Sequence, residues 1–218
     1  MVKKSTIYDA IYGRFFYAGL YDWFLSRGEA AGLSRERRLL LARAAGRVLE
    51  VGAGTGLNLP HYPPTVAELI LTEPYPHMLS LLRRKVASLG LKISAVQAAG
   101  ESLPFPEASF DTVVATFVLC TATEPERVLG EIYRILRPGG QYIFFEHVIS
   151  PDPRTKRLQN FIQPFWYYFA NGCRCNQDTE TMIKNSPLIV NQLTFNNMPK
   201  FPKIVAPMIR GVAIKPTA

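Results

Sequence analysis

The sequence predicts an α/β fold in which a mostly parallel, seven-stranded sheet carries helices on both faces. From residue 46 onward, short apolar runs alternate with amphipathic segments of helical length. A glycine-dense turn, VLEVGAGTGLN at 48–58, follows the first of these runs. Before it lies an aromatic, amphipathic segment that predicts a helical cap. A chain of 218 residues can bury a core of this kind within one domain.

Residues 1–45 are predicted to form a helical cap that belongs to the same domain as residues 46–218. Apolar and mostly aromatic residues recur at helical spacing over 7–24, and a second helix is expected over 34–45 with Ser34 as its N-cap. The aromatic helix has three interpretations. It covers the core, it closes as a lid over an apolar pocket, or it lies on a membrane surface.

The remaining elements follow in order along the chain. Five strands are predicted at 47–51, 68–72, 92–97, 112–116 and 141–147. The helices between them are expected directly after Gly56, at 76–89 and at 125–136, the last being stopped by the turn RPGG at 137–140. A second aromatic helix at 156–170, a short helix at 178–185 and two closing strands at 188–195 and 207–214 complete a Rossmann-like pattern.

The net charge of +8 lies at the two ends of the chain. Residues 1–47 carry nine Lys and Arg against four Asp and Glu, residues 151–218 carry nine against three, and the middle carries seven against ten. A solvated basic exterior is one interpretation, and contact with an anionic surface, such as phospholipid headgroups or an acidic substrate, is the alternative. No basic run is dense enough to follow a nucleic-acid backbone, so that partner is not expected.

The chain carries neither a signal-peptide pattern nor an apolar run long enough to span a bilayer. We therefore expect a cytoplasmic protein, with peripheral membrane association as the open alternative. Of the three cysteines, Cys173 and Cys175 form a C-x-C pair without a second Cys/His pair at ligand spacing. We expect free thiols and no metal site. The sequence does not indicate the oligomeric state.

The glycine loop discriminates between nucleotide-like ligands by its spacing. A dinucleotide site requires G-x-G-x-x-G, but Leu57 occupies the last required position. A P-loop requires Lys followed by Ser or Thr, which is absent after these glycines. The remaining pattern, E-x-G-x-G-x-G, brings backbone amides close to a ligand and a carboxylate near a ligand ammonium group. A purely structural turn is the alternative.

This motif resembles the first motif of the class I S-adenosylmethionine-dependent methyltransferases. The resemblance implies that S-adenosylmethionine is the cofactor. The residues of the loop that would bind it are Glu50, Gly52, Ala53, Gly54, Gly56 and Asn58.

Two further segments extend this candidate cofactor site. Glu73 ends the second predicted strand, 21 residues after Gly52, where an acidic residue takes the ribose hydroxyls in such folds; a solvated loop acid is the alternative. AAGESLPF at 98–105 resembles the G-D-A-E-x-L-P-F segment of methyltransferases of the ubiquinone-biosynthesis type. Ala99 stands where that segment has an adenine-binding acid. The cofactor-contacting residues expected outside the loop are Glu73, Pro74, Met78, Gly100, Glu101, Thr116 and Phe117, although Met78 suits the core equally well.

A narrower resemblance concerns the methyl acceptor. The pieces FVLC (117–120), RILRPGG (134–140), EHV (146–148), PFW (164–166) and GVAIK (211–215) occur in the same order in the methyltransferase-like alkyl thiol S-methyltransferases. In animals these are membrane-anchored, and this chain lacks their long apolar N-terminal segment. The resemblance, over 47–215, implies a small apolar acceptor, preferably a thiol. A quinone, phenol or phospholipid amine acceptor is the alternative, and a non-catalytic cofactor- or membrane-binding module is a rival of another class.

The expected chemistry is an in-line displacement at a sulfonium methyl, which depends mainly on positioning and on the exclusion of water. His147 is predicted at the carboxyl end of a strand, where open parallel sheets place their sites. It is a candidate proton acceptor or acceptor-orienting residue, and a structural histidine is the alternative. Glu146 is a second candidate for the same role. Cys120 is expected to be a pocket-wall thiol, because methyl transfer needs no covalent intermediate.

Overall fold

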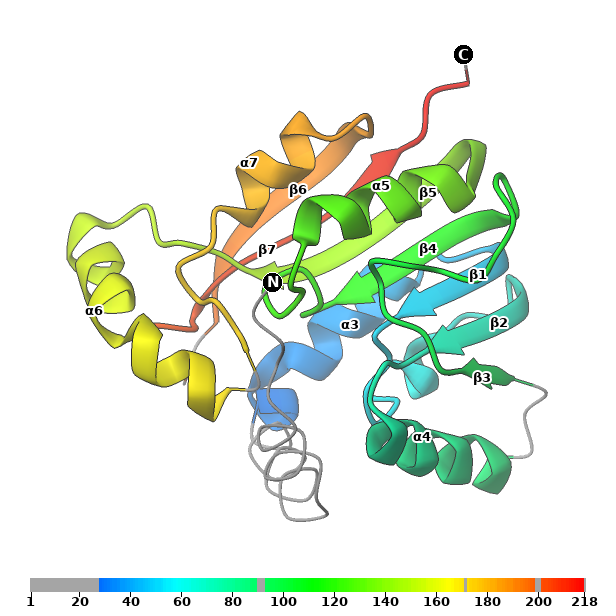
Figure 1. The fold of residues 1–218 in the computed structure, drawn as a ribbon, viewed down its shortest axis with the longest axis horizontal. Helices are drawn as coiled ribbons and strands as arrows, with labels where there is room; N and C mark the ends of the chain where they lie inside the picture. The colour runs from blue at the N-terminus through cyan, green and yellow to red at the C-terminus, as the bar shows by residue number, and fades with distance from the viewer. Residues whose placement is uncertain (1–27, 90–92, 171, 199–200, 218) are drawn as a thin grey trace.

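The structure is a computed structural model of the chain, and it describes residues 28–89, 93–170, 172–198 and 201–217. The predicted aromatic helix at 7–24 lies outside these residues. The described part contains one seven-stranded sheet in the order β3-β2-β1-β4-β5-β7-β6 (Figure 1). The strands are β1 (Gly46–Val51), β2 (Val66–Thr72), β3 (Ser94–Val96), β4 (Phe110–Thr116), β5 (Leu136–His147), β6 (Ile189–Asn197) and β7 (Pro207–Ile214).

The sheet confirms the predicted fold class. Strands β1 to β5 run parallel to one another, whereas β7 is antiparallel to both β5 and β6. The strand order reverses between β1 and β4. Strands β2 and β3 are added on one side of β1, and β4 and β5 are then added on its other side. In open α/β sheets a ligand site forms at the carboxyl ends of the strands beside such a reversal.

Helices cover both faces of the sheet, and the strands supply apolar side chains to each. These helices are α3 (Ser34–Leu41), α4 (Pro76–Ser88), α5 (Pro125–Ile135) and α7 (Thr179–Asn185), whereas α6 (Pro153–Phe169) packs elsewhere. Leu49 and Val51 of β1 join the core beneath α5 and α7, while Val48 joins the core beneath α3 and α4. This alternation fixes the register, since each such buried side chain contributes about 1.5–3 kcal/mol.

The helix predicted directly after Gly56 is not formed, and this prediction was wrong. A series of turns leads instead to a short 3-10 helix, η2 (Leu59–His61). Pro60, Pro63 and Pro64 explain the difference, because proline lacks the N–H that a helix interior requires and disfavours helical backbone in the preceding residue.

Two predicted boundaries also differ. Ser34 is not an N-cap, because a short π-helical segment, η1 (Glu29–Leu33), runs directly into α3. The predicted turn RPGG is part of β5 instead. There Gly139 has a φ of +77° and donates its N–H to the Lys215 carbonyl, while Gly140 accepts from the Lys215 N–H. These backbone bonds to the chain after β7 continue the strand through the turn residues.

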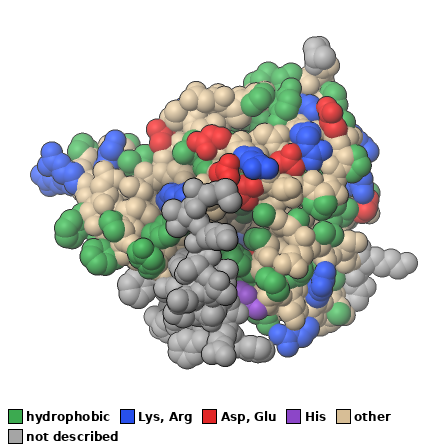
Figure 2. Space-filling view, in the orientation of Figure 1, with side chains coloured by type: hydrophobic (Ala, Val, Ile, Leu, Met, Phe, Trp, Pro, Cys, Tyr) green, Lys and Arg blue, Asp and Glu red, His purple; other side chains and the backbone are tan. Residues whose placement is uncertain are grey.

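Helix α6 projects from one end of the sheet (Figure 1). It begins at Asp152, whose carboxylate accepts the Thr155 N–H at 2.8 Å and so caps the helix. Its outer face leaves Phe161 and Phe165 with 75% and 66% of their surface exposed. Figure 2 shows hydrophobic side chains gathered over this part of the molecule with Lys and Arg at its outer end. Within the described residues, no helix is long and apolar enough to cross a membrane.

Candidate functional site: a cofactor cleft and a cysteine–histidine cluster

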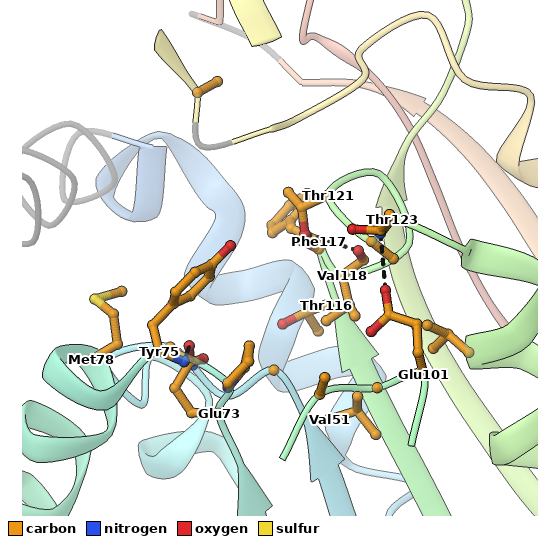
Figure 3. A pocket seen from close by; sticks show the side chains of 18 residues that line it. Val51, Glu73, Tyr75, Met78, Glu101, Thr116, Phe117, Val118, Thr121 and Thr123 are labelled. Carbon is orange, nitrogen blue, oxygen red and sulfur yellow. Dashed lines mark hydrogen bonds between the residues drawn. The ribbon is translucent and has the colours of Figure 1, made fainter. Parts of the chain in front are cut away.

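A cleft of about 250 Å³ lies at the carboxyl ends of β1, β2 and β4, beside the reversal of strand order (Figure 3). One wall comes from the glycine loop and the end of β2, and the other comes from the loops after β3 and β4. Its lining residues are Val51, Gly52, Gly54, Glu73, Pro74, Tyr75, Met78, Ala99, Gly100, Glu101, Thr116, Phe117, Val118, Thr121, Ala122, Thr123, Val128 and Ala170.

The glycine loop has the backbone that its sequence predicts. Gly52, Gly54 and Gly56 have φ angles of +64°, +57° and +77°, which side-chain-bearing residues rarely adopt. A Cβ on Gly52 would also lie 2.8 Å from Val118 Cγ2 on the opposite wall. Any larger residue at this position would therefore displace the Val118 side chain as well as strain the loop.

Glu73 directly follows β2 and is only 4% exposed, yet it lines the cleft. Its Oε2 accepts the Gly54 N–H at 2.9 Å and its Oε1 accepts the Tyr75 N–H at 3.0 Å. Burial raises the pKa of this carboxyl, and the two backbone hydrogen bonds oppose the rise. Each carboxylate oxygen keeps a second lone pair, so Glu73 can accept two hydroxyls of a ribose.

Glu50 and Asn58 do not line the cleft but fasten the two ends of the glycine loop. Asn58 Nδ2 donates to Glu50 Oε1 at 2.9 Å, and the Tyr62 hydroxyl donates to Glu50 Oε2 at 2.7 Å. Arg37, which is paired with Glu29, donates to Asn58 Oδ1 at 2.8 Å. Burial raises the pKa of Glu50 to about 7, against the lowering effect of these partners.

Sequence reasoning did not identify Arg37 or Tyr62. Arg37 shares one helical stripe with Leu33, Leu40 and Leu41, and it is 3% exposed. A charged residue within an apolar stripe is the signal that would have indicated it, since buried charges are paired.

Some of the residues predicted to bind the cofactor line the cleft, and the others do not. Gly52, Gly54, Glu73, Pro74, Met78, Gly100, Glu101, Thr116 and Phe117 line it, whereas Glu50, Ala53, Gly56 and Asn58 do not. Glu101 turns its carboxylate to the Thr123 N–H at 2.9 Å, which joins the loop after β3 to the loop before α5. Direct contact of each residue with the cofactor stays a prediction.

Glu146 is fully buried at the end of β5. Its Oε1 accepts the Val118 and Leu119 N–H groups at 2.9 and 3.0 Å, and its Oε2 accepts the Cys120 N–H at 3.3 Å. Burial raises the pKa of Glu146 to about 7, and these backbone bonds oppose the rise. The carboxylate thus organises the loop after β4, which forms a wall of the cleft.

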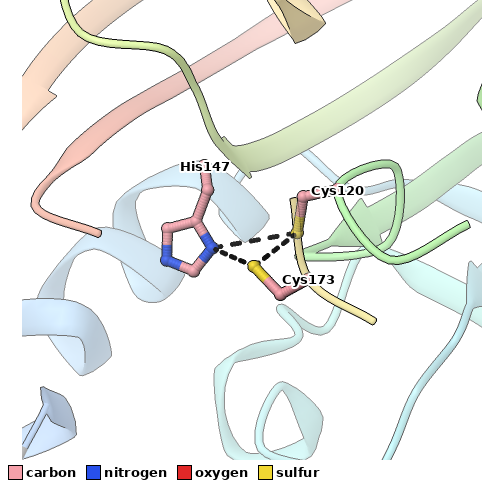
Figure 4. Close-up of side chains that lie close together, drawn as sticks. All are labelled: Cys120, His147 and Cys173. Carbon is pink, nitrogen blue, oxygen red and sulfur yellow. Dashed lines mark hydrogen bonds between the residues drawn. The ribbon is translucent and has the colours of Figure 1, made fainter. Parts of the chain in front are cut away.

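His147 lies behind this wall. Its ring packs on Phe117 with 4.7 Å between ring centroids, and Phe117 in turn lines the cleft. His147 Nδ1 lies 3.8 Å from Cys120 Sγ and 3.6 Å from Cys173 Sγ (Figure 4). The hydrogen bond between the two thiols lowers the pKa of Cys173 well below its usual range and raises that of Cys120.

All three cysteines are free, buried thiols. The sequence pattern suggested Cys173 and Cys175 as a pair, but the structure brings Cys173 to Cys120 and His147 instead. The Cys175 Sγ is directed to Gln163 Oε1, at 3.2 Å.

The fold and the cleft together define a class I S-adenosylmethionine-dependent methyltransferase. A methyltransferase domain family matches residues 49–144. The chain is 35% identical over 181 residues to thiol S-methyltransferase TMT1B of Homo sapiens, which covers 80% of this chain and 74% of the relative. It therefore belongs to the methyltransferase family that includes this relative.

Two other similarities involve methyltransferases that are named for other substrates. Phosphatidylethanolamine N-methyltransferase of Cereibacter sphaeroides is 38% identical over 143 residues, covering 64% of this chain and 68% of the relative. Among solved structures, geranyl diphosphate methyltransferase in complex with GPP and sinefungin matches with a TM-score of 0.67 at 12% identity, over 84% of this chain and 77% of that chain. The structural likeness concerns the fold alone, because folds host many reactions.

Proposed function

We propose that this methyltransferase transfers the methyl group of S-adenosylmethionine to the sulfur of a small, apolar thiol. The observation that carries the proposal is the 35% identity to a thiol S-methyltransferase over 74% of that relative's length. The cleft agrees with an apolar acceptor, because side chains of Val51, Phe117, Val118, Val128 and Ala170 line it.

The bound cofactor supplies an activated methyl group on a sulfonium. The protein would bind and orient it: Glu73 would accept the ribose hydroxyls, and the Gly52–Gly54 backbone would contact the cofactor. Phe117 and Val118, which line the cleft, would exclude water from it. A thiol has a reference pKa near 8.5, so a fraction is already thiolate at neutral pH and needs little base assistance.

Of the two predicted catalytic candidates, Glu146 suits a positioning role. Its two oxygens accept three backbone N–H groups of the wall. We propose that it holds the loop after β4 in place. His147 reaches the cleft only through the Phe117 ring, and its role is developed below.

The experiment that tests the proposal compares acceptors of matched size. Purified protein with S-adenosylmethionine is offered an alkyl thiol, the corresponding alcohol and the corresponding amine, and products are identified by mass spectrometry. We expect methylation of the thiol alone. Methylation of only the amine or alcohol would contradict the thiol assignment. Binding of S-adenosylhomocysteine without turnover of any acceptor, including the phospholipid and quinol tested below, would instead indicate a non-catalytic binding module.

A phospholipid amine is the second candidate acceptor, favoured by the 38% identity to a phosphatidylethanolamine N-methyltransferase. The same assay with phosphatidylethanolamine vesicles and with a hydroquinone addresses it and the quinone alternative. A higher kcat/KM for either than for the thiol would reassign the acceptor.

A further inference from the structure

The cluster of Cys120, His147 and Cys173 has the geometry of a tetrahedral zinc site. Around Zn²⁺ with Zn–S bonds of about 2.3 Å and Zn–N bonds of about 2.0–2.1 Å, two sulfurs lie about 3.8 Å apart and sulfur and nitrogen about 3.6 Å apart. The two sulfurs here are 3.9 Å apart, and His147 Nδ1 lies 3.8 and 3.6 Å from them. One ion can therefore reach all three atoms without rearrangement of the backbone.

The three ligand atoms come from three separate segments: the loop after β4, the end of β5 and the connection between α6 and α7. Each is fixed by backbone hydrogen bonds. The Cys120 carbonyl accepts the Arg174 N–H at 2.7 Å, and the His147 carbonyl accepts from Thr179 Oγ1 at 3.1 Å. The Cys173 N–H donates to the Ala170 carbonyl at 3.0 Å. Such pre-organisation lowers the cost of binding.

We propose that Cys120, His147 and Cys173 bind one Zn²⁺ ion. Two thiolates and an imidazole select a soft or borderline cation such as Zn²⁺ over Mg²⁺ or Ca²⁺. On binding, the two thiols release their protons to solvent as the Zn–S bonds form, and neutral His147 donates its Nδ1 lone pair.

The described residues supply no fourth side chain to this group. Glu146 is next in sequence, but its carboxylate accepts backbone N–H groups instead. Sites with three protein ligands keep their fourth position for water or substrate, whereas structural zinc sites have four protein ligands. The described part of the chain therefore supplies a three-ligand site.

The cluster adjoins the cleft through Phe117 and Ala170, which line the cleft and contact His147 and Cys173 respectively. Because the Phe117 ring lies between His147 and the cleft, the ion would join the loop after β4, the end of β5 and the connection between α6 and α7 behind the wall of the cleft.

Metal binding is tested on tag-free protein, purified under reductant and dialysed against metal-free buffer. We expect about one zinc per chain by elemental analysis after reloading with Zn²⁺, and retention against a chelating dye. Cys120→Ser and Cys173→Ser should each lower the zinc affinity at least about 10-fold. Cys175→Ser is the matched control, because Cys175 lies outside the cluster and its hydroxyl replacement keeps the Gln163 contact.

Cobalt substitution keeps the proposal testable if a serine variant fails to fold. Wild-type protein with Co²⁺ should give absorption bands of a tetrahedral site with two thiolates. Absence of zinc binding by folded wild-type protein, or equal loss in Cys175→Ser, would overturn the site. Zinc binding without any thiol methylation would leave the site standing and refute the proposed function instead.

Discussion

Replacing Glu73 with Gln should weaken cofactor binding. Glutamine keeps one acceptor oxygen, but its NH2 group must face either the Gly54 or the Tyr75 N–H, which Glu73 now accepts at 2.9 and 3.0 Å. That backbone donor loses its acceptor in the free and in the bound protein alike, so its loss lowers the stability of the fold, whereas the lost acceptor of one ribose hydroxyl lowers the affinity. A hydrogen bond to a charged group contributes about 1.5–3 kcal/mol, so we expect about a 10- to 160-fold loss of affinity.

The assay is calorimetric titration with S-adenosylhomocysteine, with thermal unfolding measured on the same samples. Glu68→Gln is the matched control, since Glu68 lies on β2, the strand that leads to Glu73, but its side chain is half-exposed and paired with Arg47 at the surface. A surface pair contributes about 0–1 kcal/mol, so this variant should bind normally. Glu73→Gln protein that binds within about threefold of wild type would refute the role assigned to Glu73.

Three further predictions concern the loop, the buried network and α6. Gly52→Ala, with its φ of +64° and a Cβ 2.8 Å from the opposite wall, should abolish measurable S-adenosylhomocysteine binding. Gly130→Ala, which meets no atom within 4 Å inside a helix, should bind normally and gain about 0.5–1 kcal/mol of stability. The pKa of Glu50 is about 7 in the folded state against 4.5 as its reference, so the folded protein holds the extra proton and loses stability as pH rises between these values. Glu50→Gln should flatten the unfolding temperature measured from pH 5 to pH 8, and a profile as steep as wild type would contradict this. Phe161→Ser combined with Phe165→Ser, both on the exposed face of α6, should reduce the sedimentation of the protein with anionic vesicles. Wild-type protein that does not sediment with these vesicles would contradict the membrane interpretation.

Local spacing in the sequence was enough to predict the sheet, the glycine loop and the acidic residue at the end of β2. A loop that needs positive φ at alternate positions contains glycine at those positions. A strand buried on both faces consists of continuous apolar residues. These patterns depend on residues that are close in the sequence, so they can be recognised without knowledge of the fold. The same local reasoning failed after Gly56. A helix was predicted there, but the prolines of the following segment prevent it from forming.

Only the tertiary structure decided which polar groups face one another. Glu50 is held by Asn58 and Tyr62 and so fastens the loop, while Glu146 serves the backbone of the loop after β4. Cys120 and Cys173 are 53 residues apart and meet only because two loops converge at the end of β5. A contact between two segments that are distant in the sequence produces no periodic residue pattern in either segment. The sequence by itself therefore determined the fold and the cofactor, and the folded chain alone placed two thiols and an imidazole behind the cofactor cleft.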